Sequence, residues 1–248
     1  MRGGPVSPAG APPAWAASDP YAAALRSGRG PLFLRRADGR LLPLDVERWC
    51  ARADAVDRAV LARCEGAVLD VGCGPGRLVA ELAAQGRTVL GVDVCEAAVT
   101  RTVTVGGQAL RRSVFGPLPG EGRWGTVLLM DGNIGIGGDP PALLRRMRRL
   151  LRPGGLLMAE TAPADVDERA EVRVVGHGRE ASGEPFPWAW TGAPALLGAA
   201  ERAGWRTVAQ WTAGGRCFVA LRALSPRSAS SSAEPPKSTA VISSQRPR

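Results

Sequence analysis

Histidine and lysine, two side chains that often carry catalysis, are nearly absent from this sequence, which has one of each among 248 residues. Arginine supplies the other basic side chains, and the formal net charge is +9. So strong a preference for arginine reflects codon composition as much as function. Part of the charge lies in the terminal segments, so the remaining excess is modest, and we do not expect nucleic acid as the partner.

The sequence also lacks the patterns of a disulfide framework, a zinc site and a membrane protein. Its five cysteines include no Cys-x-x-Cys pair, and their number is odd, which favours a reducing cytoplasm. No apolar run approaches 18 residues, so we expect no membrane span. The first 17 residues are rich in proline and alanine without an apolar core segment, so they predict no secretory signal.

Length and pattern predict one main domain with a cap before it and a tail at each end. Residues 1–17 and 225–248 are too poor in large apolar side chains to offset chain entropy, so we expect them to be disordered. Residues 18–63 predict a cap of short helices and a hairpin. Residues 64–224 predict the main domain, with an insertion at 162–192 that forms a lid or a substrate wall.

Apolar strands alternate with amphipathic helices through the main domain, which predicts an α/β fold with a parallel sheet. Residues 205–223 differ, because they indicate two strands joined at Gly214-Gly215. A terminal antiparallel hairpin added to a parallel sheet predicts a mixed sheet. The expected strands cover 67–72, 88–93, 109–114, 124–131, 156–161 and the two halves of 205–223.

Three glycines at alternate positions, Gly72, Gly74 and Gly76, end the first of these strands. Glycine permits a positive φ and removes the Cβ that would block a ligand, and the N-terminus of the following helix offers free N–H groups. A dinucleotide fingerprint requires a third glycine where Arg77 stands. The turn therefore predicts a ligand site of another class at the switch point of the sheet.

The series from Asp70 to Gly76 resembles motif I of the class I S-adenosylmethionine-dependent methyltransferases. Asp93 ends the second strand, where that family has the acid that binds the ribose hydroxyls. The resemblance covers roughly residues 45–223 and implies a Rossmann-like, doubly wound sheet of seven strands. The stretches "DGNIGIGGDP" and "FPWAW" look like a small actinobacterial-type subgroup of the family.

The resemblance implies S-adenosylmethionine as the cofactor. At the end of the third strand the family often has an acid that touches the adenine, and Ser113 is the nearest match here. Asp131 ends the fourth strand, which in the family faces the methionine end of the donor. The residues expected to bind the cofactor are Asp70, Gly72, Cys73, Gly74, Gly76, Asp93, Val94, Ser113 and Asp131.

Methyl transfer from a sulfonium is an in-line displacement, which needs a base only if the acceptor must lose a proton early. His177, in the insertion, is the candidate base because imidazole titrates near neutral pH; the alternative is an ordinary exposed loop histidine. Asp131 is the second catalytic candidate, and its alternative is a local cap of the glycine-rich loop that follows.

Four residues are candidates for contact with the acceptor. Trp188 and Trp190 lie on the same side of an extended segment, where they wall a pocket for a flat or apolar acceptor or else cover the core. Asn133 follows the fourth strand and contacts the donor or the acceptor. Arg48 pairs with the donor carboxylate or else forms a structural salt bridge.

The sequence thus predicts a methyltransferase that acts on oxygen or nitrogen of a small molecule. The alternatives are an RNA or protein acceptor, a nucleotide-dependent oxidoreductase, and a cofactor-binding module without catalysis. Five arginines between 145 and 152 predict a solvated helix face rather than an RNA-binding patch. We expect no metal centre, because no matching acid pair accompanies Asp131, Asn133 and Asp139.

Overall fold

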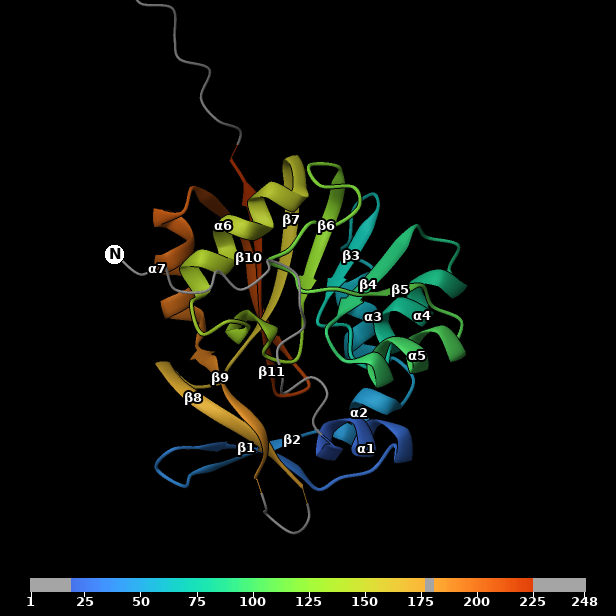
Figure 1. Cartoon of the computed structure of the whole chain (residues 1–248). Helices are drawn as coiled ribbons and strands as arrows, with labels where there is room; N and C mark the ends of the chain where they lie inside the picture. The colour runs from blue at the N-terminus through green and yellow to red at the C-terminus, as the bar shows by residue number, and fades with distance from the viewer. Residues whose placement is uncertain (1–18, 177–180, 225–248) are drawn as a thin grey trace, which may run out of the picture.

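The computed structural model describes residues 19–176 and 181–224, which form two sheets with helices around them (Figure 1). The larger sheet has seven strands in the order β10-β11-β7-β6-β3-β4-β5, and the smaller has four in the order β2-β1-β8-β9. The predicted tails at 1–17 and 225–248, and the predicted base His177, lie outside the described residues.

The larger sheet confirms the predicted fold class. Its parallel strands are β3 (Val68–Val71), β4 (Val89–Asp93), β5 (Ala109–Arg111), β6 (Trp124–Leu129) and β7 (Leu151–Thr161). Strand β11 (Arg216–Ala223) pairs antiparallel with both β7 and β10 (Trp205–Ala213), as the terminal hairpin predicts. Because β3, β4, β6 and β7 are parallel, their carboxyl ends meet at one edge of the sheet.

Helices cover both faces of this sheet, so it is doubly wound. On one face, α6 (Pro140–Leu150) and α7 (Ala193–Arg202) enclose a core that includes Leu143, Met147 and Leu196. On the other, α3 (Ala55–Leu61) and α4 (Arg77–Ala84) enclose a second core. Helix α5 (Glu96–Thr104) packs beside β4 and β5 at the sheet's far edge.

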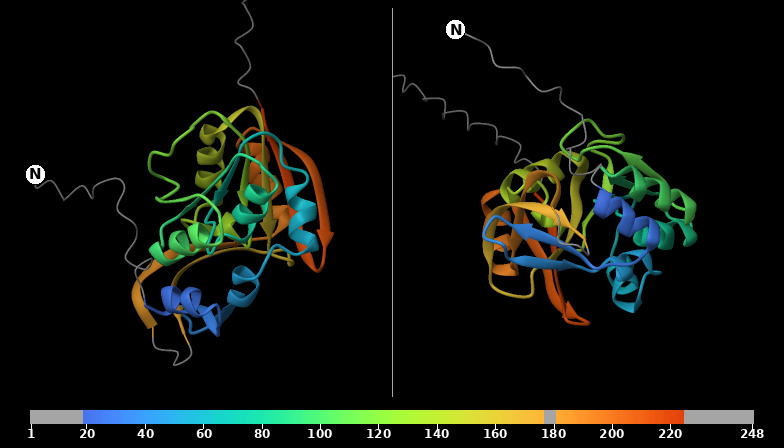
Figure 2. Two further views of the ribbon diagram at one scale, coloured as in Figure 1. Left: turned by 90° about the vertical axis from the view of Figure 1, so that its right-hand side faces the viewer. Right: turned by 60° about the horizontal axis from the view of Figure 1, so that its bottom comes forward.

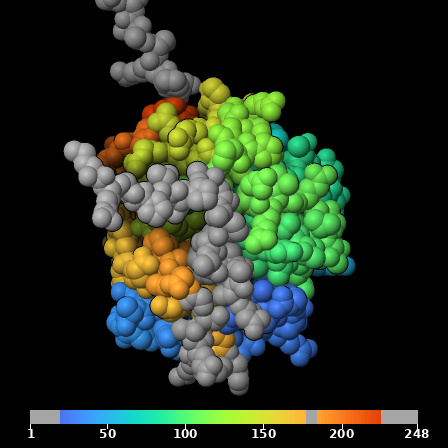
Figure 3. All heavy atoms as spheres, in the orientation of Figure 1, coloured from blue at the N-terminus to red at the C-terminus, as the bar shows by residue number. Residues whose placement is uncertain are grey.

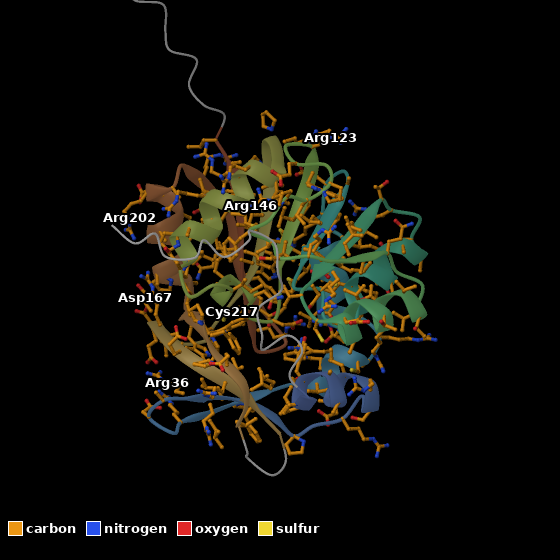
Figure 4. The ribbon with its side chains drawn as sticks, viewed as in Figure 1. Arg36, Arg123, Arg146, Asp167, Arg202 and Cys217 are labelled. Atoms are coloured by element: carbon orange, nitrogen blue, oxygen red, sulfur yellow. The ribbon has the colours of Figure 1, made fainter. Side chains whose placement is uncertain are left out.

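One arginine of α6 contradicts the prediction of a solvated basic face. Arg146 is 5% exposed, and its guanidinium donates to the carboxylate of Glu121 and to the carbonyl of Val114. Figure 4 labels it among the side chains around α6. Arg148 likewise donates to the carbonyls of Ala203 and Leu224. These two guanidiniums hold loops and a strand end in place, which leaves fewer charges for a patch that binds polyanions.

The smaller sheet joins two segments that the sequence analysis treated separately. The cap contributes β1 (Leu32–Arg36) and β2 (Leu41–Leu44), and the insertion contributes β8 (Asp167–Val175) and β9 (Ala181–Thr191). Strand β1 pairs antiparallel with β8, with Leu34 opposite Val174. In the space-filling view the blue β1–β2 hairpin adjoins the yellow and orange atoms of β8 and β9 (Figure 3). Cap and insertion are therefore one structural unit.

This unit lies across the carboxyl edge of the seven-stranded sheet, together with α1 (Asp19–Ser27) and α2 (Val46–Cys50) (Figures 1 and 2). Its apolar face has a core of its own, which includes Leu32, Leu34, Val172 and Phe186. No helix among residues 19–176 and 181–224 is long and apolar enough to cross a membrane.

Candidate functional site

A cavity of about 380 Å³ lies between the carboxyl edge of the large sheet and the apolar face of the small one. This volume is within the usual range for small-molecule sites. Both sheets supply its walls, so the site depends on the cap and the insertion as well as on the glycine turn. The predicted site residues that line it are Gly72, Asp93, Val94, Ser113, Asp131, Asn133 and Trp188.

The glycines of the turn have three different surroundings, although all have a positive φ. A Cβ on Gly76 would fall 2.5 Å from the hydroxyl of Thr102, so this glycine lets α4 approach α5. A Cβ on Gly72 would fall 2.6 Å from the amide nitrogen of Asn133. At Gly74 the nearest atom would be the Tyr21 hydroxyl at 4.0 Å, so the turn is most open there.

The start of α4 has the free N–H groups that the sequence predicts. Gly76 is the N-cap and no side chain caps the helix, so the N–H groups of its first turn have no side-chain acceptor. Such groups, with the helix dipole, favour an anionic or electron-rich ligand atom.

Asp93 presents a fixed carboxylate to the cavity. One oxygen accepts a hydrogen bond from the Gly74 N–H at 2.9 Å and the other from the Cys95 N–H at 2.8 Å. Burial raises the pKa of Asp93, while these backbone N–H groups act in the opposite direction. A carboxylate has about four acceptor positions, so capacity for a diol remains.

Four residues predicted to bind the cofactor do not line the cavity: Asp70, Cys73, Gly74 and Gly76. The Asp70 side chain is 2% exposed, and its Oδ2 has no hydrogen-bond partner among the described residues. Burial raises the pKa of Asp70 to about 7. The Cys73 side chain packs in the core near Thr102, and its N–H donates to the carbonyl of Val92. Contact of these residues with a cofactor stays a prediction.

Asp131 is held among arginines at the carboxyl end of β6. Its carboxylate accepts two hydrogen bonds from Arg77, at 2.7 and 2.9 Å, and pairs with Arg48 at 2.8 Å. Burial alone would raise the pKa of Asp131, but these guanidiniums hold it below its usual value. Its φ of 57° is the one positive value at a non-glycine residue in the described chain. The surrounding ion pairs thus fix an otherwise unfavourable backbone conformation.

The ion pairs of Asp131 extend into a buried network that the sequence analysis missed. Asp57 is fully buried and accepts from Arg77 at 2.9 Å and from Arg216 at 2.8 Å. Arg216 also binds Glu160 through two hydrogen bonds. Arginine at position 77 was visible as the missing third glycine, but its partners Asp57 and Asp131 lie on two segments far from it in the sequence. No local pattern indicates them.

Asn133 and Arg48 have structural partners in addition to their predicted roles. The Asn133 amide donates to the carbonyls of Val71 and Gly72, at 3.0 and 2.9 Å, and so braces the glycine turn. Arg48 binds Asp45 at 2.9 Å as well as Asp131, and it does not line the cavity. The structure therefore contains the salt bridge that was the alternative to a donor contact for Arg48.

The two predicted tryptophans differ in position. Trp188 lines the cavity and meets the Phe186 ring edge to face, with centroids 6.3 Å apart. Trp190 packs on the same apolar face, under the guanidinium of Arg36, but is not part of the cavity wall. Ser113 lines the cavity, and its hydroxyl accepts from the Phe115 N–H.

Four aromatic residues of the wall were not among the residues predicted from the sequence. Tyr21 belongs to α1, Trp49 to α2, Phe115 to the loop after β5, and Phe186 to β9. Burial, with Asp93 nearby, raises the pKa of the Tyr21 hydroxyl well above its usual value. The sequence places α1 and α2 in the cap, but only the packing of the cap over the turn brings these rings to the site.

Comparison with known proteins agrees with this architecture. A sequence model of the methyltransferase domain matches residues 45–210. No curated protein matches the sequence. Among solved structures, a S-adenosylmethionine-dependent methyltransferase from Bacteroides fragilis, in complex with S-adenosylhomocysteine, is similar with a TM-score of 0.69 and 20% identity. The similarity covers 89% of this chain and 98% of that one.

Two further structures share the fold at lower similarity. A glycopeptide N-methyltransferase complexed with S-adenosylmethionine has a TM-score of 0.53 and 17% identity, over 71% of this chain and 95% of that one. A 1,6-didemethyltoxoflavin N1-methyltransferase from Burkholderia thailandensis has a TM-score of 0.50 and 21% identity, over 70% and 77%.

Proposed function

The chain belongs to the methyltransferase domain family, and on that premise we propose that it transfers a methyl group from S-adenosylmethionine to a nitrogen or oxygen atom of a small molecule. The observation that carries the proposal is the buried Asp93 carboxylate, which lines the same cavity as Gly72 and accepts a hydrogen bond from the Gly74 N–H of the glycine turn. A ribose diol on Asp93 would add two charge-assisted hydrogen bonds to those from the backbone.

The remaining residues of the wall fit the rest of this donor. Val94 and Ser113 lie beside Asp93 and suit the adenine ring, which needs an apolar surface and few hydrogen bonds. The methionine end would extend toward Asp131. Two similar structures are named as complexes with S-adenosylhomocysteine and S-adenosylmethionine, which supports this class of ligand.

The bound donor would supply an activated methyl group on its sulfonium. As the acceptor lone pair forms the new bond to the methyl carbon, the carbon–sulfur bond would break and its electrons would pass to sulfur. The contribution of the chain is to hold the acceptor in line and to exclude water. Asp131 stays ionised because of Arg77 and Arg48, so we assign it an electrostatic and positioning role rather than that of a base.

A small acceptor is favoured over a polymer by the shape of the site. Sheet β2-β1-β8-β9 and helices α1 and α2 cover the carboxyl edge, where an open groove would be needed for a strand of nucleic acid. The similar toxoflavin and glycopeptide enzymes are named as N-methyltransferases, which supports nitrogen as the acceptor atom.

Incubation with donor carrying a radiolabelled methyl group tests this function. A cell extract is the source of acceptors, and the products are divided into small-molecule and polymer fractions. We expect label in the small-molecule fraction, and much less of it with Asp93→Ala protein at a donor concentration that half-saturates the wild type. Label in RNA or protein would contradict the proposed acceptor class, and the absence of any label would contradict the enzyme activity.

His177 stays the candidate base, and its role is tested with the acceptor found in that screen. If it removes the acceptor proton, His177→Gln will lower kcat about a hundredfold or more. The wild-type pH profile will fall below about pH 6.5, and this fall will be missing in the variant. The KM for the donor should not change. An unchanged kcat and pH profile would show that the acceptor loses its proton elsewhere.

A further inference from the structure

The chain has twelve aromatic residues, and five of them line this one cavity. They come from α1, α2, the loop after β5, and β9, so segments far apart in the sequence converge here. The five are Tyr21, Trp49, Phe115, Phe186 and Trp188. Clustered rings offer flat apolar surfaces that favour offset or edge-to-face contacts with another ring.

The wall opposite the glycine turn carries no charge. Sheet β2-β1-β8-β9 supplies Leu34, Leu44 and Val174 to it, in addition to Phe186 and Trp188. An anionic ligand placed against this wall would lose its hydration without gaining a partner, whereas a cation would be attracted to the faces of the rings.

Charged residues do line other parts of the cavity, but each already has a partner. Asp93 accepts two backbone N–H groups and faces the donor. Asp131 is paired with Arg77 and Arg48. Arg112, at the exposed rim, donates to the carbonyl of Arg111. In the described structure, none of these three side chains is positioned to pair with a charge on the acceptor.

One polar atom of the aromatic wall has no partner. The indole Nε1 of Trp49 is buried and makes no hydrogen bond within residues 19–176 and 181–224. A ligand in the cavity does not reach this nitrogen, because it has almost no accessible surface, so Trp49 contributes the surface of its ring rather than a hydrogen bond. Phe115, at the rim near Gly137, is 48% exposed.

From this wall we propose that the acceptor is a small, planar aromatic molecule without negative charge that stacks on these rings. The inference rests on the proposed function and specifies its substrate. Transfer to such a molecule is balanced: a ring or substituent nitrogen forms the bond to the methyl carbon, the carbon–sulfur bond breaks toward sulfur, and any proton on that nitrogen passes to a base or to water.

Calorimetry with saturating S-adenosylhomocysteine tests the inference with three probes of similar shape. Quinoline is planar and neutral at pH 8, naphthalene has the same shape without the nitrogen, and 2-naphthoate is anionic. We expect quinoline and naphthalene to bind, and the anion to bind at least about tenfold more weakly because the wall offers it no counter-charge. Absent quinoline binding, or equal binding of the anion, would overturn the inference.

Variants locate the binding to the aromatic wall. Trp49→Ala removes one ring of the wall and should weaken the binding of both quinoline and naphthalene about threefold to tenfold. Phe115→Ala removes an exposed ring without opening the core and should weaken binding of both probes. Trp211→Ala is the matched control, since Trp211 stacks on Phe218 away from the cavity. Equal effects of Phe115→Ala and Trp211→Ala would place the probes elsewhere.

S-adenosylhomocysteine titrated alone separates the two proposals. If it fails to bind the wild-type protein, the proposed function fails with it. If it binds but quinoline does not, the donor assignment stands and only the acceptor class is wrong.

Discussion

Asp93→Ala protein is expected to bind S-adenosylhomocysteine about a hundredfold more weakly than the wild type, because two charge-assisted hydrogen bonds to the ribose are lost. The carboxylate also orders Gly74 and Cys95, so the variant loses part of the shape of the turn as well. Calorimetry gives the affinity, and thermal unfolding shows that the variant is folded.

Two further variants separate charge from shape at this position. Asp93→Asn keeps the size of the side chain and removes the charge, so we expect an intermediate loss of affinity. Glu96→Ala removes a nearby surface carboxylate that pairs with Arg111 and should leave the affinity unchanged. An Asp93→Ala protein that binds as tightly as the wild type would remove the assigned role of Asp93.

Asp57→Ala is expected to lower the free energy of unfolding by about 3–5 kcal/mol, because it leaves two buried guanidiniums without their shared partner. Asp57 is fully buried and accepts hydrogen bonds from both Arg77 and Arg216. Urea unfolding measures the change. The control Glu96→Ala breaks an exposed pair and should cost less than about 1 kcal/mol. Similar losses for the two variants would contradict the structural role of the network.

The same carboxylate gives the protein a specific sensitivity to acid. Burial would raise the pKa of Asp57, but the hydrogen bonds from Arg77 and Arg216 lower it from 3.8 to about 2. A lowered pKa in the folded state contributes stability above the unfolded pKa, and this contribution is lost as the pH falls through the folded one. Wild-type stability should therefore fall more steeply than that of Asp57→Asn between about pH 4 and 2.

The seven-stranded sheet and the donor half of the site were predictable because their signals are local. Asp70 to Gly76 lie within one strand and one turn, and Asp93 ends the next strand. In a parallel sheet, strand order and strand ends then bring these residues to one edge. The antiparallel hairpin was equally local, since Gly214-Gly215 separates its two strands.

The acceptor half was not predictable, since it depends on pairing between distant strands. The sequence predicts a hairpin in the cap and an insertion at 162–192, but no pattern indicates that Leu34 lies opposite Val174. Without that pairing, the cap and the insertion would be two separate elements. The rings of Tyr21, Trp49 and Trp188 would then not line one cavity. The arginine network escaped prediction for the same reason, because Asp57, Asp131 and Glu160 are far apart in the chain.

Titration of the wild-type protein with S-adenosylhomocysteine and, separately, with NADH tests the central claim most directly. The glycine turn with arginine at position 77 and a carboxylate at the end of β4 predicts one bound S-adenosylhomocysteine per chain and no measurable heat with NADH. Binding of NADH without binding of S-adenosylhomocysteine would contradict the account.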